Sequence, residues 1–319
     1  MKLEQVLVLG GSGFVGTSLA NRLADRGLRV RIPTRRRARA GHLLPLPTVD
    51  VIEADVHDDA TLERLLDGVD AVVNLVAVLH SPSGKPYGPA FEKAHVALPR
   101  RLVAACARQG VRRLVHVSAL GAAEDGPSEY LRSKAAGEAA IRAAGRGLEW
   151  TIVRPSVIFG PGDRFLNMFA GLLRFIPLLP IGGAGSRLQP VYVEDVAELL
   201  AASLNMPEAV GQTWDAAGPR VYTLEQLVEY VGEVSGHRGL VIPLPGPLAM
   251  IQAAVMERLP NAPLSRDNLR SLQKDSVVQG DPLPFGAAPT PLEAIAPLYL
   301  SAQRRRASFF GAAQHGREF

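Results

Sequence analysis

Short apolar runs alternate with helix-periodic segments through the first half of the chain. The runs predict strands at Gln5–Leu9, Leu28–Pro33, Val49–Glu53, Ala71–Leu75, Arg113–Val117 and Glu149–Arg154. The segments between them predict helices at Phe14–Arg26, Asp58–Leu66, Phe91–Arg108 and Glu129–Ala144. Pro99 predicts a kink in the third helix or a helix that begins there. Buried strands that alternate with amphipathic helices are typical of an α/β fold with a doubly wound parallel sheet. We expect this domain at residues 1–154.

The pattern changes after Arg154, where proline and glycine become frequent up to Pro190. Later segments predict helices at Val193–Leu204, Leu224–Val234, Pro247–Leu259 and Ser265–Lys274, and strands near Gln189–Tyr192 and Gln212–Ala216. Residues 155–306 are therefore expected to form a smaller, mostly helical C-terminal lobe, some segments of which return to the first domain. Residues 307–319 lack any pattern and predict a flexible tail. Ligands of doubly wound sheets bind beyond the strand C-termini, so this lobe should close over them.

Composition narrows the functional classes. The 319 residues are 47% hydrophobic and 21% charged, which is typical of a globular protein. The net charge of +4 comes largely from two local arginine clusters, and aromatic residues make up only 6%, so we predict no nucleic-acid partner. The histidines are scattered and have no cysteine partners, which predicts no metal site.

Cysteine usage and apolar run lengths bear on location. Cys106 is the single cysteine, which excludes an internal disulfide and indicates a reducing compartment. No secretory signal or bilayer-length apolar run is visible. Pro243, Pro245 and Pro247 interrupt the longest candidate, Leu240–Met256, which we expect to form a loop followed by an amphipathic helix. We therefore expect a cytoplasmic protein.

The most informative motif follows the first predicted strand, where residues 6–16 read V-L-V-L-G-G-S-G-F-V-G. Its glycines are spaced as in a dinucleotide-binding turn: the first permits the turn, the second lets a pyrophosphate approach, and the third lets helix and strand pack closely. The phosphates would then lie on free N–H groups at the helix start. A glycine-rich surface turn is the alternative. The expected cofactor contacts here are Gly10, Ser12, Gly13, Phe14, Val15 and Gly16.

The end of the second predicted strand distinguishes the two nicotinamide cofactors. Sites that select NAD usually place a carboxylate there, but none occurs between Arg26 and Val49. Thr34, Arg35 and Arg36 stand there instead, and guanidinium groups match the geometry of a 2′-phosphate. This favours NADP(H) over NAD(H), with a solvated basic loop as the alternative. Asp55, followed by Val56, is placed to bind the adenine amino group or to cap the next helix.

Tyr130 and Lys134 are four residues apart on a predicted helix and therefore share a face. A lysine ammonium beside a tyrosine lowers the pKa of the phenol, so that the tyrosine can act as a general acid or base. The same lysine could hold the nicotinamide ribose. The pair follows Ser118, at the end of the fifth predicted strand.

Together these residues resemble the extended and atypical short-chain dehydrogenase/reductase superfamily, which includes the NAD-dependent epimerase/dehydratase-like proteins. The resemblance covers essentially the whole chain. It rests on the glycine motif, Asp55-Val56, Val115-His116-Val117-Ser118-Ala119 and Tyr130-x-x-x-Lys134. Residues 154–165 (R-P-S-V-I-F-G-P-G-D-R-F), 188–197 (L-Q-P-V-Y-V-E-D-V-A) and 264–269 (L-S-R-D-N-L) are most similar to one atypical branch. This is the branch of the NAD(P)H-binding accessory subunit (alpha-subcomplex subunit nine) of respiratory complex I.

The resemblance implies a Rossmann-type core that holds the cofactor. Further contacts are expected along the nicotinamide and adenosine, at Leu75, Val76, Ala77, Val117, Pro155, Ser156, Val157 and Ile158. Family members carry a catalytic Ser or Thr often one place after Ser118, where this chain has Ala119. The register of Ser118 is therefore open. The segment between Ser118 and Tyr130 is also short for a sugar-nucleotide epimerase.

Two functions follow from the resemblance. The first is an oxidoreductase or epimerase that works by hydride transfer, with Tyr130, Lys134 and Ser118 as catalytic residues. The second is a catalytically weak cofactor-binding structural or assembly subunit of a respiratory NADH-quinone oxidoreductase, since mitochondrial relatives are regarded as structural. Such a protein could sit at the periphery of the inner membrane.

The substrate is unknown, and Arg164 and Arg187 are its candidate ligands. Arg187 could grip a diphosphate or be a plain surface residue. The apolar segment Phe165–Ile181 predicts core packing, with a pocket for an apolar substrate such as a quinone or lipid as the alternative. Pro247–Leu259 is likewise expected to pack on the core rather than lie on a membrane, because it lacks a strongly basic face.

Overall fold

The computed structural model describes residues 3–258 and 264–301, so the predicted tail at 307–319 lies outside the described residues. The chain forms two compact units. Unit 1 comprises Met1–Pro155, Val193–Ala216 and Leu283–Phe285. Unit 2 comprises Ser156–Tyr192, Ala217–Pro282 and Gly286–Phe319. The segment Val193–Ala216 belongs to unit 1 because its last residues pair with the central sheet.

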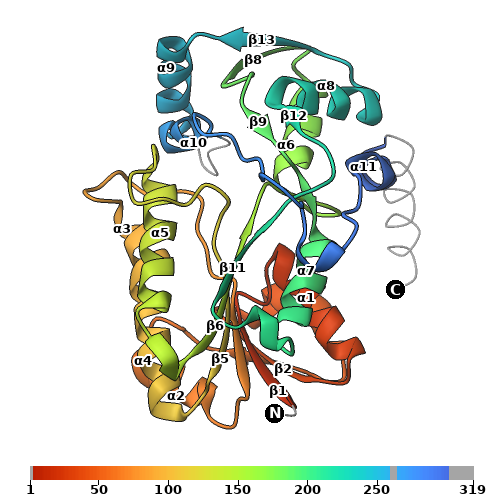
Figure 1. Ribbon diagram of the computed structural model, residues 1–319. Coiled ribbons are helices and arrows are strands. Elements are labelled where there is room, and N and C mark those ends of the chain that lie inside the picture. Colours follow the sequence, from red (N-terminus) through yellow and green to blue (C-terminus); the bar gives the residue numbers. More distant parts are fainter. Residues whose placement is uncertain (1–2, 259–263, 302–319) are drawn as a thin grey trace. The chain divides into compact units, whose positions relative to one another are not determined.

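Unit 1 is built on a seven-stranded sheet in the order β11-β6-β5-β4-β1-β2-β3, and every neighbouring pair is parallel (Figure 1). The strands are β1 (Gln5–Leu9), β2 (Arg29–Thr34), β3 (Val49–Glu53), β4 (Ala71–Asn74), β5 (Arg113–Val117), β6 (Glu149–Pro155) and β11 (Gln212–Ala216). Residues 6–9 of β1 and all residues of β4 are fully buried, as expected for a sheet covered on both faces. This confirms the predicted doubly wound fold of the Rossmann type.

Helices cover both faces of this sheet. One layer holds α1 (Phe14–Asp25) against α7 (Val193–Ser203), and the other holds α2 (Asp59–Leu66), α4 (Leu98–Gln109) and α5 (Glu129–Arg142) (Figure 1). Short turns complete the unit: α3 (Pro89–Phe91), η1 (Arg37–Leu43), η3 (Gly145–Gly147), η4 (Pro207–Ala209) and η5 (Pro284–Gly286), the last of which ends in unit 2.

The sequence left open whether Pro99 kinks a helix or lies where one begins, and the structure around Pro99 decides between the two. A π-helical segment, η2 (Glu92–Ala97), runs directly into α4, and Pro99 lies in the first turn of α4. Proline has no N–H to donate, so the first turn of an α-helix tolerates it. The wider π-turn precedes it, and the backbone stays helical at Ala97 and Leu98. The two segments therefore form one continuous helical rod with its irregular turn before Pro99.

Unit 2 is mostly helical, as predicted. Its helices are α6 (Phe165–Leu173), α8 (Leu224–Ser235), α9 (Gly246–Met256), α10 (Arg266–Ser271) and α11 (Leu292–Leu300). Three two-stranded sheets join them: β7 (Ile158–Phe159) with β10 (Val191–Tyr192), β9 (Arg187–Leu188) with β12 (Tyr222–Thr223), and β8 (Leu178–Gly182) with β13 (Leu240–Leu244). The core lies among α6, α8 and α11, where Leu166, Phe169 and Leu227 are buried.

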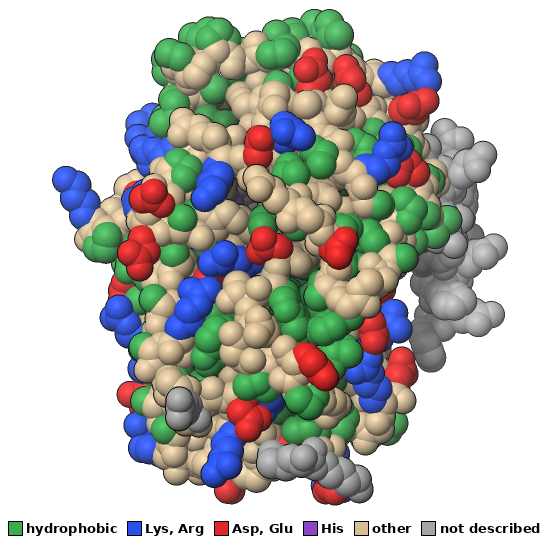
Figure 2. All heavy atoms as spheres, viewed as in Figure 1, with side chains coloured by type: hydrophobic (Ala, Val, Ile, Leu, Met, Phe, Trp, Pro, Cys, Tyr) green, Lys and Arg blue, Asp and Glu red, His purple; other side chains and the backbone are tan. Residues whose placement is uncertain are grey.

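Two expectations for unit 2 were wrong in part. The proline-rich residues 240–244 form a strand rather than a loop, because in a two-stranded sheet every strand is an edge and tolerates proline. Leu248, Ile251 and Val255 of α9 are 55%, 62% and 58% exposed, so this helix does not bury its large side chains in the core. Figure 2 shows apolar side chains gathered over α9 and β13 at the top of the view.

Within the part of the chain that the structure describes, no helix is both long enough and apolar enough to cross a bilayer.

Candidate active site

The glycine motif forms the turn between β1 and α1. Gly10 has φ +80°, a conformation that favours glycine, and its carbonyl accepts a hydrogen bond from the amide of Gly13 at 3.0 Å. Gly13 caps α1 in extended conformation without a side-chain hydrogen bond, and the first turn holds no acidic residue. The N-terminal amides of α1 are thus presented without a competing side chain, which suits an anionic ligand.

The turn also requires close backbone approach. A Cβ on Gly16 would lie 2.5 Å from the carbonyl oxygen of Gly10 and from the Cα of Gly11. A Cβ on Gly10 would lie 3.1 Å from the carbonyl carbon of Leu75. The turn therefore packs against the loop that follows β4, and the two predicted cofactor segments, 10–16 and 75–77, are adjacent in unit 1. Val76 is anchored there by the side chain of Asn74, whose Oδ1 accepts its amide at 3.2 Å.

The basic loop after β2 begins at Thr34, which is buried and whose Oγ1 donates to the carbonyl of Arg36 at 3.3 Å. The side chains of Arg35 and Arg36 are exposed. A carboxylate reaches this loop from the neighbouring strand, because β2 and β3 pair so that Thr34 lies opposite Glu53. A carboxylate oxygen of Glu53 accepts a hydrogen bond from the amide of Arg37 at 3.1 Å.

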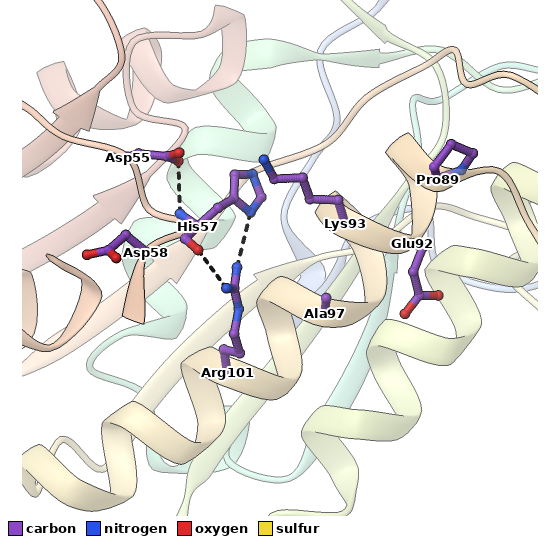
Figure 3. A pocket seen from close by; sticks show the side chains of 8 residues that line it. All are labelled: Asp55, His57, Asp58, Pro89, Glu92, Lys93, Ala97 and Arg101. Atoms are coloured by element: carbon purple, nitrogen blue, oxygen red, sulfur yellow. Dashed lines mark hydrogen bonds between the residues drawn. The ribbon is translucent and has the colours of Figure 1, made fainter. Parts of the chain in front are cut away.

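A pocket of about 520 Å³ opens between the end of β3 and the η2–α4 rod (Figure 3). It is lined by Asp55, His57, Asp58, Pro89, Glu92, Lys93, Ala97 and Arg101. Arg101 donates to the carbonyl oxygen of His57 at 2.6 Å and lies 3.3 Å from its Nδ1. Burial lowers the pKa of His57, and the charges of Lys93, Arg101 and Arg35 lower it further, so the ring is neutral at pH 7. The pocket is therefore bordered both by the cations Lys93 and Arg101 and by the carboxylates of Asp55, Asp58 and Glu92.

For Asp55 the sequence left two roles open: binding the adenine amino group or capping the next helix. Asp58 is the N-cap of α2 and accepts the amide of Thr61 at 2.8 Å, which lowers its pKa. Asp55 is exposed, and its Oδ1 accepts the amide of His57 at 3.0 Å. The capping role expected as an alternative for Asp55 thus belongs to Asp58. The neighbouring Val56 packs against the core.

Lys134 and Tyr130 occupy α5 beside the end of β5. Lys134 is 1% exposed, and its Nζ donates to the carbonyl oxygen of Val117 at 2.7 Å. Burial lowers the pKa of Lys134 to about 8, although Glu138 opposes this shift. Burial raises the pKa of Tyr130 to about 12. The sequence led us to expect a pKa of Tyr130 lowered by the lysine; desolvation dominates instead.

Ser118 lies just past β5 and is 4% exposed. Its amide donates to the carbonyl oxygen of Val153 at 2.8 Å, but its Oγ has no hydrogen-bond partner among the described residues. Buried hydroxyls are nearly always paired, so an unsatisfied one calls for a ligand or water. Tyr130, Lys134 and Ser118 all belong to unit 1, so the structure brings the three candidate catalytic residues into one domain.

Sequence reasoning missed a buried histidine beside Tyr130. The ring of His95 packs edge-on against Tyr130 at 5.5 Å between centroids, and burial together with Lys134 lowers its pKa to about 2. Its Nε2 accepts the amide of Val78 at 3.0 Å, so its Nδ1 carries the proton and donates to Ser133 Oγ at 2.8 Å. Ser133 in turn donates to the carbonyl oxygen of Tyr130 at 2.7 Å. His95 thus links the loop after β4 to the start of α5.

A second buried polar pair joins β4 to β5. Asn74 Nδ2 donates to Nδ1 of His116 at 3.1 Å, which leaves the proton of the neutral ring on Nε2. Nε2 has no hydrogen-bond partner within the described ranges. His116 is 1% exposed, so Asn74 pairs with a buried ring.

The remaining candidate residues lie at the end of β6 and in unit 2. Pro155 ends β6, and its carbonyl accepts the amide of Leu120 at 2.9 Å. In unit 2, Ser156 Oγ donates to the carbonyl oxygen of Ser276 at 3.0 Å. The carbonyl oxygen of Val157 accepts the amide of Val191 at 2.9 Å, and Ile158 is the first residue of β7. Arg164 is exposed before α6, and Arg187 lies 3.9 Å from the carboxylate of Asp275.

Residues 3–258 and 264–301 contain no group of three or more His, Cys, Asp or Glu side chains that could hold a metal ion.

Comparison with known proteins supports this interpretation of unit 1. The chain is 34% identical over 302 residues to NADH dehydrogenase (ubiquinone) 1 alpha subcomplex subunit 9, mitochondrial, of Mus musculus, covering 90% of this chain and 77% of the relative. It is 30% identical to ceramide reductase of Caulobacter vibrioides, covering 79% and 77%.

A solved structure of UDP-glucose 4-epimerase from Thermus thermophilus in complex with NAD superimposes with a TM-score of 0.63 at 22% identity, over 84% of this chain and 99% of that one. This likeness bears on the fold. The profile of the NAD dependent epimerase/dehydratase family matches residues 6–217. The chain therefore belongs to the NAD-dependent epimerase/dehydratase family and has its nicotinamide-dinucleotide-binding fold.

Proposed function

We propose that this protein binds NADP(H) on unit 1 and acts as an oxidoreductase or epimerase of the short-chain dehydrogenase/reductase type. The observation that carries the proposal is the turn at residues 10–16. Its helix amides are uncapped, no carboxylate opposes an anion there, and a Cβ on Gly16 would lie 2.5 Å from backbone atoms. A cofactor diphosphate is complementary in charge to this turn, and the close packing at Gly16 is the packing that the third glycine of such turns permits.

The preference for the phosphorylated cofactor rests on the loop after β2. Arg35 and Arg36 are exposed, and the charge of Arg35 contributes to the lowered pKa of His57 in the adjoining pocket. A 2′-phosphate near this loop would meet guanidinium groups in a favourable geometry. The carboxylate of Glu53 accepts the amide of Arg37, which supports its role as an anchor of the loop rather than a ribose ligand.

Paired titrations test the preference. NADPH should bind more tightly than NADH to the native protein, and Arg35→Ala should reduce that ratio by roughly tenfold, the value of one lost charge-assisted contact. Arg39→Ala is the matched control, because Arg39 is an exposed residue of the same loop whose amide donates to Arg36. Equal affinity for the two cofactors in the native protein would contradict an NADP(H) preference.

The state of Tyr130 suggests the direction of proton transfer. The bound nicotinamide would supply or accept a hydride at its C4. With a pKa of about 12 the Tyr130 hydroxyl is protonated at neutral pH, so it would donate its proton to a carbonyl oxygen as that oxygen gains charge. The unpaired Oγ of Ser118 is available to donate a hydrogen bond to the same oxygen. Lys134 fixes α5 against β5 through Val117 and would bind the nicotinamide ribose.

Turnover is tested by following NADPH oxidation with a panel of carbonyl substrates. The relationship to ceramide reductase makes long-chain, apolar carbonyl compounds the first choice. Tyr130→Phe should abolish oxidation and leave NADPH affinity unchanged, since the hydroxyl alone is lost. A Tyr130→Phe variant as active as the native protein would exclude this role for Tyr130.

The similarity to a complex I subunit supports a second candidate function. On this proposal the protein is a structural or assembly subunit of a respiratory NADH-quinone oxidoreductase, in the cytoplasm or at the periphery of the inner membrane. NADP(H) would then stabilise the native fold by binding only to it. Tight NADPH binding without turnover, together with co-purification of a tagged chain with the respiratory complex, would favour it. An active protein that never co-purifies would favour the enzyme.

A further inference from the structure

Unit 2 carries a group of large apolar side chains that face solvent. They lie on the turn after α6, on the β8–β13 pair and on α9. We refer to this set as the apolar patch: Phe175, Ile176, Leu178, Leu240, Ile242, Leu248, Ile251 and Val255. Their exposed fractions run from 40% for Ile242 to 78% for Phe175. Large exposed apolar areas on soluble proteins usually mark an interaction surface.

The large apolar side chains of α9 are exposed because of the way this helix packs. Its only buried residues are Ala249 and Ala253, whereas Leu248, Ile251 and Val255 point outward on one face, at spacings of three and four residues. A Cβ on Gly182 of β8 would lie 2.4 Å from the Cβ of Ala249, so the helix lies tightly against the strand through small residues. The usual arrangement of a surface helix, with large apolar residues inward, is reversed here.

The strands and the preceding turn extend the same surface. Leu178 and Leu240 are partners across the parallel β8–β13 pair, and both are exposed, while their neighbours Leu179 and Val241 are buried. The five consecutive residues 174–178 are all exposed. The amide of Leu240 donates to the carbonyl of Pro177 at 2.8 Å, which ties this turn to the strand pair.

The distribution of charged residues around the apolar patch indicates what kind of partner the patch contacts. Neither 175–186 nor 239–256 contains an ionisable residue, and an arginine stands on each side of both segments. Arg174 lies over the ring of Phe175, with its guanidinium carbon 5.4 Å from the ring centroid, and Arg258 is exposed one turn beyond Val255. Of the flanking arginines, Arg187 lies 3.9 Å from Asp275 and Arg238 is paired with Glu233 at 3.1 Å. Glu257, which precedes Arg258, is paired with Arg266 at 2.9 Å, so Arg174 and Arg258 are the bordering cations that remain for a partner. An uncharged apolar surface with basic residues at its border matches the acyl boundary and anionic headgroups of a lipid bilayer.

We propose that the apolar patch is a docking surface for the interface of an anionic lipid bilayer. The aliphatic side chains of α9 and of the β8–β13 pair enter the headgroup–acyl boundary, and Arg174 and Arg258 contact the headgroups. The protein is thereby held on the membrane surface without spanning it. This attachment is independent of cofactor binding, which takes place on unit 1.

Vesicle co-sedimentation of the full chain tests the proposal. The probes are vesicles of phosphatidylcholine alone and of an equimolar mixture of phosphatidylcholine and phosphatidylglycerol. The native protein should bind the mixed vesicles and bind the neutral ones at least several-fold more weakly, because surface charge adds to apolar burial. The Ile251→Asp/Val255→Asp double variant should lose at least about tenfold in binding to the mixed vesicles, since it places two charges in the apolar boundary.

Leu44→Asp is the matched control, because Leu44 is 51% exposed but belongs to unit 1. It should bind like the native protein. Thermal unfolding of the double variant checks that the fold is kept. Three results would overturn the proposal: no binding to either vesicle, equal binding by the double variant, or self-association of the native chain that the double variant abolishes without any vesicle binding. The last would make the patch an interface between copies of the chain.

Discussion

Replacing Gly16 with alanine tests the glycine turn most sharply. The new Cβ would lie 2.5 Å from Gly10 O, Gly11 Cα and Gly11 O, a distance that real Cβ atoms do not tolerate. All three atoms belong to the backbone, so relief requires α1 to move away from the turn. Forced overpacking of this kind costs about 1–3 kcal/mol, while alanine gains about 1 kcal/mol of helix propensity over glycine. We therefore expect a net loss of up to about 2 kcal/mol in the free energy of unfolding.

Ligand affinity should fall as well as stability. The displaced amides are those expected to hold the cofactor diphosphate, so Gly16→Ala should weaken NADPH binding at least about tenfold, equivalent to 1.4 kcal/mol. Fluorescence titration measures the affinity, and thermal unfolding with and without NADPH measures the stability.

The control is Gly171→Ala in α6, where a Cβ meets nothing within 4 Å. It should raise stability by up to about 1 kcal/mol and leave affinity unchanged. Native stability and affinity in the Gly16→Ala variant would refute the reasoning.

Three further predictions concern the site residues. Arg35→Ala should lower the ratio of NADPH to NADH affinity, measured by titration, while Arg39→Ala keeps it. Tyr130→Phe should abolish NADPH oxidation at unchanged cofactor affinity, measured with carbonyl substrates. Lys134 has a folded-state pKa of about 8, below its ordinary 10.5, so the unfolded chain binds more protons between these values and the free energy of unfolding rises with pH across that window. That rise, about 3 kcal/mol, should be absent from denaturation curves of Lys134→Met.

Local pattern was sufficient for most of unit 1. Strands β1, β3 and β5 have the bounds expected from the sequence, because a short, mostly apolar run ends abruptly at glycine or polar residues in each case. The turn at Gly10 was predictable for the same reason, since its positive φ and its close contacts need glycine at fixed spacing.

Long-range partners were not predictable from the sequence. His95 lies in a π-helical turn, and it bonds to Val78 and Ser133 from elsewhere in the chain. Nothing in the local pattern marks it, although an isolated histidine on the apolar face of a helix is a signal worth testing. The Glu53 carboxylate reaches the Arg37 amide only through the register of β2 and β3.

In unit 2 the sequence did not reveal which apolar side chains are buried, because hydrophobicity alone does not show which surfaces pack together. The sequence of α9 suggested core packing, yet the helix buries its alanines and exposes its leucine, isoleucine and valine. Strands β8 and β13 contain prolines that are tolerated only because each strand has a single neighbour.

Calorimetric titration of the purified chain with NADPH and, separately, with NADH tests the central claim most directly. The account predicts saturable binding at one site per chain, tighter for NADPH and weakened in the Gly16→Ala variant. A native, folded protein that takes up neither dinucleotide would contradict it.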